Sequence, residues 1–137
     1  MWYVRKAGLG LLMGMKGELK PVEFIEDAAV PVEVMPQYLR EVADLIQRHN
    51  REVTMYAHVS VGLVHVRTRL NPKREENIKI MRRISESPLD LVLKYGGMMS
   101  GEHGDGLVRS YLNPKFFGPK LYQAFRELKP RSTLRAS

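Results

Sequence analysis

A single glycine, Gly62, separates two short runs of β-type residues, and this spacing constrains the fold of the chain most strongly. The runs are Met55 to His58 before it and Leu63 to Val66 after it. Glycine adopts positive φ angles without steric cost, so it permits a tight turn between two strands. We therefore expect a β-hairpin that brings His58 and His65 close together.

A second glycine-punctuated segment, Ser100 to Gly106, reads Ser-Gly-Glu-His-Gly-Asp-Gly. Its glycines let the backbone pass close to a ligand, and the consecutive Glu102 and His103 would point in different directions on extended backbone. Two imidazoles and one carboxylate form a three-ligand set that leaves metal coordination positions open. We predict that His58, His65 and Glu102 bind a metal and that His103 lies beside it.

The alternative is a structural role, because a buried histidine usually forms hydrogen bonds within a core and a surface glutamate is usually solvated. The chain has four histidines, and three of them fall in these two segments. That concentration favours the metal site.

Length and composition are typical of one globular domain, with 137 residues and 44% hydrophobic content. No cysteine is present, which excludes disulfides, catalytic thiols and iron–sulfur clusters within these residues. The apolar run from Ala7 to Met15 is short and broken by glycine, so we expect neither a transmembrane segment nor a signal peptide. A cytoplasmic location is the simplest expectation.

The formal net charge of +7 favours anionic partners. Nucleic acid is one class of anion, but aromatic residues do not alternate with arginine or lysine as they do in a stacking platform. We therefore expect no nucleic-acid binding. Arg5 and Lys20 suit a small carboxylate equally well, because guanidinium and ammonium groups both bind carboxylates.

The first half of the chain shows a strand followed by a helix. Val22 to Glu26 alternates apolar and acidic residues, which predicts a strand. Pro31 and Pro36 then lead into a helix that ends near Asn50. Its core face carries four apolar residues, namely Leu39, Val42, Ala43 and Ile46.

The second half predicts further helices. Asn71 and Pro72 are expected to cap a helix that packs through Ile78, Met81 and Ile84. Pro88 removes a helical hydrogen bond, so this stretch forms either one kinked helix or two, the second running from Pro88 to Tyr95. A last helix is expected from Pro119 to about Lys129, with its inward face formed by Leu121, Tyr122, Phe125 and Leu128.

Together these elements predict an α+β fold with an antiparallel sheet, helices packed on one face and a ferredoxin-like topology. We expect residues 1–129 to form the domain. Residues 130–137 are polar and are expected to form a disordered tail.

The segment from Gly97 to Gly106, taken with His58 to His65, resembles the carboxy-terminal domain of FAD-linked oxidases. That family includes D-lactate dehydrogenases, D-2-hydroxyglutarate dehydrogenases and the FAD subunit of glycolate oxidase. Phe24 to Pro31 and Trp2 to Lys6 are also similar to family segments, so the resemblance extends over most of the chain.

The resemblance implies roles for individual residues. His58, His65 and Glu102 match ligands of a divalent metal, usually zinc, and His103 matches the proposed general base. Arg5 and Lys20 match basic positions that hold the carboxylate of a 2-hydroxy acid, which is oxidised by transfer of a hydride to FAD. We also count Arg67 among the substrate-binding positions.

The family pattern further implies partners. The segments Ser-Val-Gly and Glu-His-Gly-Asp-Gly resemble the branch that is often fused to an iron–sulfur region. The amino-terminal FAD-binding domain of the family is absent from these residues, and they contain no dinucleotide-binding glycine fingerprint. We therefore expect an FAD-binding domain in cis or in trans, without which the chain should be inactive.

Two alternatives remain open from the residues. The first is a stand-alone binding module, or a truncated fragment, that keeps the shape of the domain without catalysis. The second is a metal-dependent hydrolase in which His58, His65 and Glu102 hold a zinc-bound water. Hydrolysis in the absence of flavin would distinguish the hydrolase.

Overall fold

A computed structural model describes residues 3, 7–8, 10–11 and 14–133. The chain divides into two compact units, Met1–Gly104 and Asp105–Ser137. The first unit contains the sheet and two long helices.

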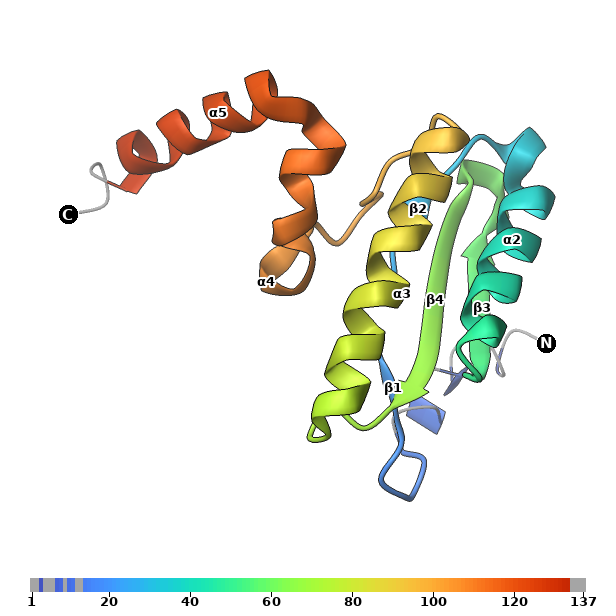
Figure 1. The fold of residues 1–137 in the computed structure, drawn as a ribbon. Helices are drawn as coiled ribbons and strands as arrows, with labels where there is room; N and C mark the ends of the chain where they lie inside the picture. Colours follow the sequence, from blue (N-terminus) through green and yellow to red (C-terminus); the bar gives the residue numbers. More distant parts are fainter. Residues whose placement is uncertain (1–2, 4–6, 9, 12–13, 134–137) are drawn as a thin grey trace. The chain divides into compact units, whose positions relative to one another are not determined.

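The sheet is antiparallel and has four strands, which confirms the predicted α+β class (Figure 1). The strands are β1 (Lys20–Val22), β2 (Ala28–Ala29), β3 (Val53–His58) and β4 (Leu63–Leu70). Thr68 of β4 pairs with Val22 of β1 and with Val53 of β3, so these two strands lie on opposite edges of β4. β2 and β3 likewise lie on opposite edges of β4. The ferredoxin-like topology stays a prediction.

The predicted hairpin is confirmed as β3 and β4. Its strands are longer than expected. A single turn of 3-10 helix, Val59–Val61, followed by Gly62 connects the two strands. Gly62 has a φ of 70°, and a Cβ atom built there would lie 1.9 Å from the carbonyl oxygen of Val30. Glycine is therefore required both by its backbone conformation and by the close approach of a neighbouring chain segment.

The predicted strand from Val22 to Glu26 is wrong for most of its length. β1 ends at Val22, and the chain leaves the ladder before β2 begins at Ala28. Asp27 has a φ of 74°, a left-handed conformation that a strand does not accommodate. The edge strand is therefore interrupted, and the interruption buries Glu26 and Asp27.

Helix α2 (Met35–Arg48) confirms the predicted first helix. It buries Met35, Tyr38, Val42 and Ile46 at 4% exposure or less. Lys94 and Tyr95, at the end of the next helix, hydrogen-bond to Glu41 of α2.

Helix α3 (Glu75–Lys94) runs as one element through Pro88, so the single-helix alternative holds. The predicted cap at Asn71 is wrong, because Arg74 is the N-cap residue and the Asn71 side chain accepts a hydrogen bond from the Lys73 N–H instead. Ile84 is fully buried as expected. Ile78 is 52% exposed, so its predicted place in the core is wrong.

Helices α2 and α3 lie together on one face of the sheet, as predicted (Figure 1). Side chains alternate along a strand, so Val64, Val66 and Leu70 point to one face of β4 while His65 and Arg67 point to the other. The three apolar residues are at most 1% exposed and form the core with the helices. The histidine is therefore carried on the opposite face.

The second unit is helical, with α4 (Gly106–Arg109), a 3-10 turn at Ser110–Leu112 and α5 (Asn113–Thr133). Gly118 breaks α5, with φ 73° and ψ 169°, so a helical stretch begins after it near the predicted start. The prediction that this helix buries an apolar face is wrong for three side chains, since Leu121, Phe125 and Leu128 are 40% to 63% exposed.

The helix continues past Lys129 to Thr133, while residues 134–137 lie outside the described part, so the predicted disordered tail stays a prediction. Among the helices that the structure describes, none has the length and apolar character needed to cross a membrane.

Candidate metal centre

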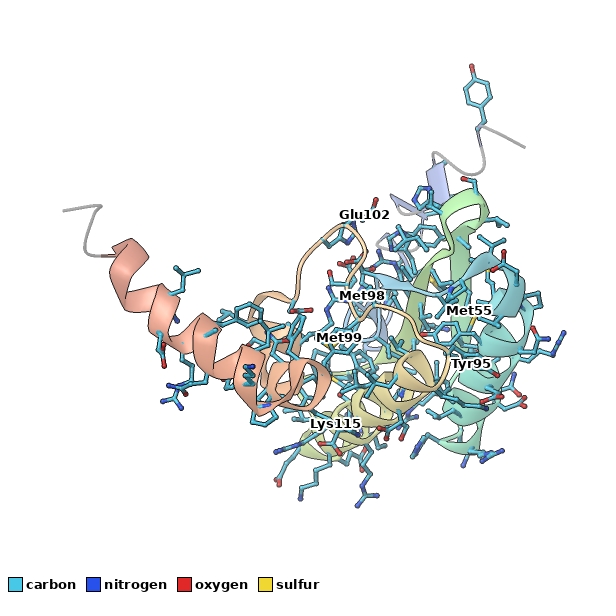
Figure 2. All side chains as sticks on the ribbon, turned by 90° about the horizontal axis from the view of Figure 1, so that it is seen from above. Met55, Tyr95, Met98, Met99, Glu102 and Lys115 are labelled. Carbon is cyan, nitrogen blue, oxygen red and sulfur yellow. The ribbon has the colours of Figure 1, made fainter. Side chains whose placement is uncertain are left out.

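The predicted ligands converge at one end of the β-hairpin. His58 ends β3, His65 lies in β4, and Glu102 lies in the loop that follows Met98 and Met99 (Figure 2). The His65 Nε2 to Glu102 Oε1 distance is 3.2 Å, and the His58 Nε2 to Glu102 Oε1 distance is 3.9 Å. One ligand atom from each residue lies within 4.8 Å of the others. Two imidazole nitrogens and a carboxylate oxygen at this spacing fit a divalent metal such as zinc.

The three side chains differ in burial. His65 is 1% exposed and stacks on Tyr56 with a ring separation of 4.5 Å, whereas the side chains of His58 and Glu102 are 40% and 45% exposed. Burial lowers the pKa of His65, although the nearby carboxylates of Glu26 and Glu102 oppose that shift. A lowered pKa keeps the imidazole neutral, which is the form that binds a metal.

His103 lies beside this group. Its Nδ1 is 2.6 Å from Glu26 Oε1, its Nε2 is 3.3 Å from Glu102 Oε1, and its side chain is 48% exposed. The hydrogen bond with Glu26 raises the pKa of His103. In the neutral tautomer whose proton is on Nδ1, the ring donates to Glu26 and presents the Nε2 lone pair to the site.

Glu26 is held by a buried arginine. Arg67 is 3% exposed, its Nη2 is 2.9 Å from Glu26 Oε2, and it also pairs with Glu23 and donates to the Tyr56 hydroxyl at 3.1 Å. Burial lowers the pKa of Arg67, but the hydrogen bond to Tyr56 and the two carboxylates raise it overall. These partners pair with the guanidinium that the sequence suggested for substrate, and the substrate-binding role of Arg67 stays a prediction.

Asp27 organises the ligand loop, a role that sequence reasoning missed. Its buried carboxylate accepts hydrogen bonds from the Ser100 hydroxyl at 2.5 Å, the Glu102 N–H at 3.0 Å and the His103 N–H at 2.8 Å. Its own carbonyl oxygen accepts from the Gly101 N–H at 2.7 Å. Burial raises the pKa of Asp27, but these donors outweigh burial and the pKa is lowered. The signal in the sequence was an acidic pair directly after two apolar residues, Phe24 and Ile25.

The predicted basic residues are not part of the cluster as described. Arg5 lies outside the described residues. Lys20 is exposed at the start of β1, pairs with Leu70 at the far end of β4, and donates from Nζ to the Met15 carbonyl at 2.5 Å. The structure therefore joins the four predicted metal and base residues, while the contacts described for Lys20 do not include them and its substrate-binding role stays a prediction.

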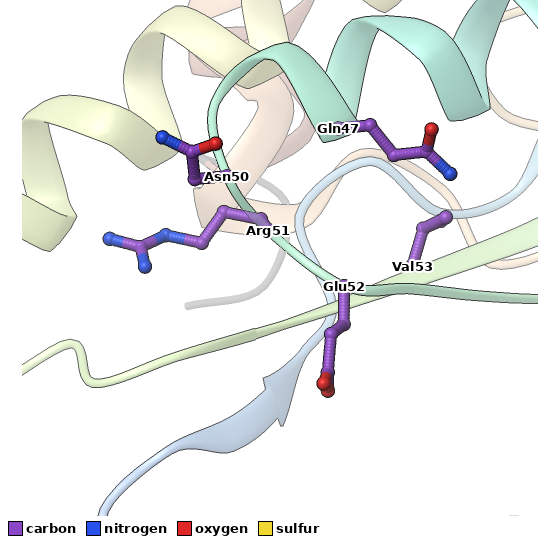
Figure 3. Close-up of a pocket in the computed structure, with 5 residues that line it drawn as sticks. All are labelled: Gln47, Asn50, Arg51, Glu52 and Val53. Carbon is purple, nitrogen blue, oxygen red and sulfur yellow. The ribbon is translucent and has the colours of Figure 1, made fainter.

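A separate open hollow lies where α2 connects to β3 (Figure 3). It is lined by Gln47, Asn50, Arg51, Glu52 and Val53 and contains none of the cluster residues.

Comparison with known proteins gives the family of the chain. Residues 1–130 match the family model described as FAD linked oxidases, C-terminal domain. The chain belongs to this family. It is 40% identical over 129 residues to a D-2-hydroxyglutarate dehydrogenase of Haemophilus influenzae, a match that covers 94% of this chain and 12% of that protein.

Two further relatives show the same relation. A D-2-hydroxyglutarate dehydrogenase of Escherichia coli is 37% identical over 129 residues, covering 94% of this chain and 13% of the relative. A D-lactate dehydrogenase of Archaeoglobus fulgidus is 30% identical over 114 residues, a match that covers 83% of this chain and 25% of that protein. The chain thus spans a quarter or less of the length of these curated relatives.

Proposed function

We propose that this chain is the substrate- and metal-binding domain of an FAD-dependent 2-hydroxy acid dehydrogenase. The observation that carries the proposal is the convergence of His58, His65 and Glu102, with His103 beside them. The relatives named D-2-hydroxyglutarate dehydrogenase and D-lactate dehydrogenase support a small 2-hydroxy acid as the substrate class.

A divalent metal, represented by zinc in a first experiment, would be held by His58, His65 and Glu102. His65 supplies a fixed ligand because packing against Tyr56 holds its ring, and the half-exposed His58 and Glu102 complete the set. When bound, the metal supplies Lewis-acid polarisation of the hydroxyl and carboxylate oxygens, and the flavin supplies a hydride acceptor.

His103 is the general base of this proposal. Nε2 accepts the hydroxyl proton of the substrate, while Nδ1 stays hydrogen-bonded to Glu26. The carboxylate of Glu26 stabilises the imidazolium that results, and Arg67 holds that carboxylate in place.

The remaining partners follow from the family. We propose that Arg5 and Lys20 bind the substrate carboxylate and that FAD is bound by a domain of the same polypeptide or of a second one. An iron–sulfur region or subunit and a cytoplasmic location are further parts of this proposal, which purification of the native complex and cell fractionation test.

The metal is tested by loading the purified chain with zinc and measuring bound metal by elemental analysis. We expect one equivalent for the native chain and a loss for His58→Ala, His65→Ala and Glu102→Gln. His49→Ala is the matched control, because His49 follows α2 and is absent from the cluster. Native levels of zinc in the three ligand variants would contradict the site.

The roles of the two consecutive residues are tested together. In the presence of the FAD-binding domain, His103→Ala should abolish oxidation of the hydroxy acid and retain the metal, whereas Glu102→Gln should lose both. Loss of metal in His103→Ala with retention in Glu102→Gln would show that the roles are exchanged. Hydrolysis by the zinc-loaded chain without flavin would instead support the hydrolase alternative.

A further inference from the structure

Glu26 and Asp27 are adjacent acidic residues in the break of the edge strand, between β1 and β2. They are 5% and 0% exposed. Burying a carboxylate is costly unless it is paired or hydrogen-bonded, and the left-handed φ of 74° at Asp27 adds backbone strain. The contacts of the two carboxylates therefore indicate the function of this interruption of the strand.

Every hydrogen bond described for the Asp27 carboxylate reaches the segment from Ser100 to His103. Two of its donors are the backbone N–H groups of Glu102 and His103, and the third is the Ser100 hydroxyl. A carboxylate that accepts from successive N–H groups fixes the direction of the backbone between them. The side chains of Glu102 and His103 then leave this backbone toward His65 and Glu26.

The Glu26 carboxylate acts on side chains. Oε1 contacts His103 Nδ1 at 2.6 Å, and Oε2 lies 2.9 Å from Arg67 Nη2 and 3.8 Å from His65 Nδ1. It therefore faces the ring nitrogens that point away from Glu102, since His65 Nε2 and His103 Nε2 approach Glu102 Oε1 at 3.2 and 3.3 Å. Such outer partners orient histidine ligands and fix their tautomers.

We propose that the Glu26–Asp27 pair is the positioning element of this site, in which Asp27 sets the backbone of the ligand loop and Glu26 sets the ring of His103. The proposal rests on the proposed function, because the groups that it positions are the proposed ligand and base. Neither residue is among the proposed ligands, His58, His65 and Glu102. The left-handed conformation of Asp27 allows the neighbouring carboxylates of Glu26 and Asp27 to contact different parts of one site.

The role of Asp27 is tested with Asp27→Asn, which keeps the side-chain volume and tolerates positive φ but replaces one acceptor oxygen with a donor. We expect zinc affinity to fall by about 10–100-fold, as is common when an outer partner of a metal site is removed. Amide hydrogen exchange at Glu102 and His103 should accelerate even without metal, while exchange in α2 stays unchanged. Asp44→Asn, an exposed position on α2, is the matched control.

The role of Glu26 is tested with Glu26→Gln and nitrogen NMR of the His103 ring in the metal-free chain. The native ring should show a proton at Nδ1. Because the Arg67 guanidinium lies 2.9 Å from Glu26 Oε2, the glutamine should keep its oxygen on that side, turn its NH2 toward His103 and move the ring proton to Nε2. Glu23→Gln is the matched control, since Glu23 pairs with Arg67 and has no described contact with His103.

These experiments separate the positioning element from the metal site. Unchanged amide exchange and zinc affinity in Asp27→Asn, or an unchanged ring tautomer in Glu26→Gln, would overturn the corresponding half of the proposal. If the native chain binds no zinc, the proposed function fails, but hydrogen exchange and ring NMR of the metal-free chain still decide whether Glu26 and Asp27 position the loop and the ring.

Discussion

The two faces of β4 are equally buried for different physical reasons. Val64 and Val66 are 0% and 1% exposed beneath α2 and α3, while His65 and Arg67 are 1% and 3% exposed on the opposite face. The apolar pair is buried because removing such side chains from water is favourable, by about 1.5–3 kcal/mol for a fully buried valine. The polar pair is buried only because carboxylates and aromatic rings compensate for lost hydration.

The apolar face of β4 accounts for folding, and its polar face accounts for chemistry. A buried ion pair adds little net stability over an apolar pair of similar size, yet breaking one is costly. The network of Arg67, Glu26 and His103 is therefore poorly explained by stability alone and is explained by a site that needs a fixed imidazole. Variants on each face should separate the two roles.

The largest loss of stability is expected for Gly62→Ala, in the turn that both faces share. The new Cβ would meet the Val30 carbonyl oxygen, and the positive φ costs about 1–2 kcal/mol besides. Gly96→Ala is the matched control, because Gly96 has a φ of 64° and open space around its Cβ position. Equal midpoints in urea unfolding for the two variants would show that the close approach to Val30 is absent.

On the polar face, Arg67→Met should destabilise the fold by about 3–5 kcal/mol, because it leaves the buried Glu26 carboxylate without its cation. Arg69→Met, two residues along the same face, removes a 30% exposed side chain paired with Glu52 and should cost about 0–1 kcal/mol. Urea unfolding compares the two free energies. Similar losses would mean that the Arg67 network is no more critical than a surface pair.

On the apolar face, Leu70→Ala should cost about 2–5 kcal/mol through lost burial and a residual cavity. The zinc bound per folded molecule should stay unchanged, because Leu70 points away from the histidine cluster. Thermal unfolding and elemental analysis of one preparation measure both quantities. A folded Leu70→Ala variant without zinc would show that the two faces are not separable.

The smallest effect is expected for Glu41→Gln, where Glu41 of α2 meets Lys94 and Tyr95 at the end of α3. Hydrogen bonds from these residues lower the pKa of Glu41 below its ordinary value. Its stabilisation is therefore present at neutral pH and is lost as the pH falls through the folded-state pKa. The melting temperature of Glu41→Gln should be slightly lower than that of the control variant Glu33→Gln at pH 7, and the two should be equal in strong acid. A difference that persists in strong acid would contradict this expectation.

Local sequence features were sufficient to predict the hairpin and its histidines. Gly62 between two β-type runs fixed the turn, and the strict alternation of side chains along β4 then determined the face of His65. The family resemblance added the role of His103 as general base. Each of these predictions depended on neighbouring residues or on a recognisable motif.

The supporting residues could not be predicted in the same way. The acidic and apolar alternation before Asp27 indicated a continuous strand, and a positive φ at an aspartate has no reliable local signal. The partners of Asp27 lie more than seventy positions away in sequence. Long-range hydrogen bonds of this kind become visible only when the fold is known.

X-ray absorption spectroscopy of the zinc-loaded chain shows whether His58, His65 and Glu102 share one cation. We expect a first shell that contains two imidazole nitrogens and a carboxylate oxygen, unchanged in His49→Ala and reduced by one imidazole in His58→Ala. A shell without imidazole, or one that His58→Ala leaves unaltered, would contradict it.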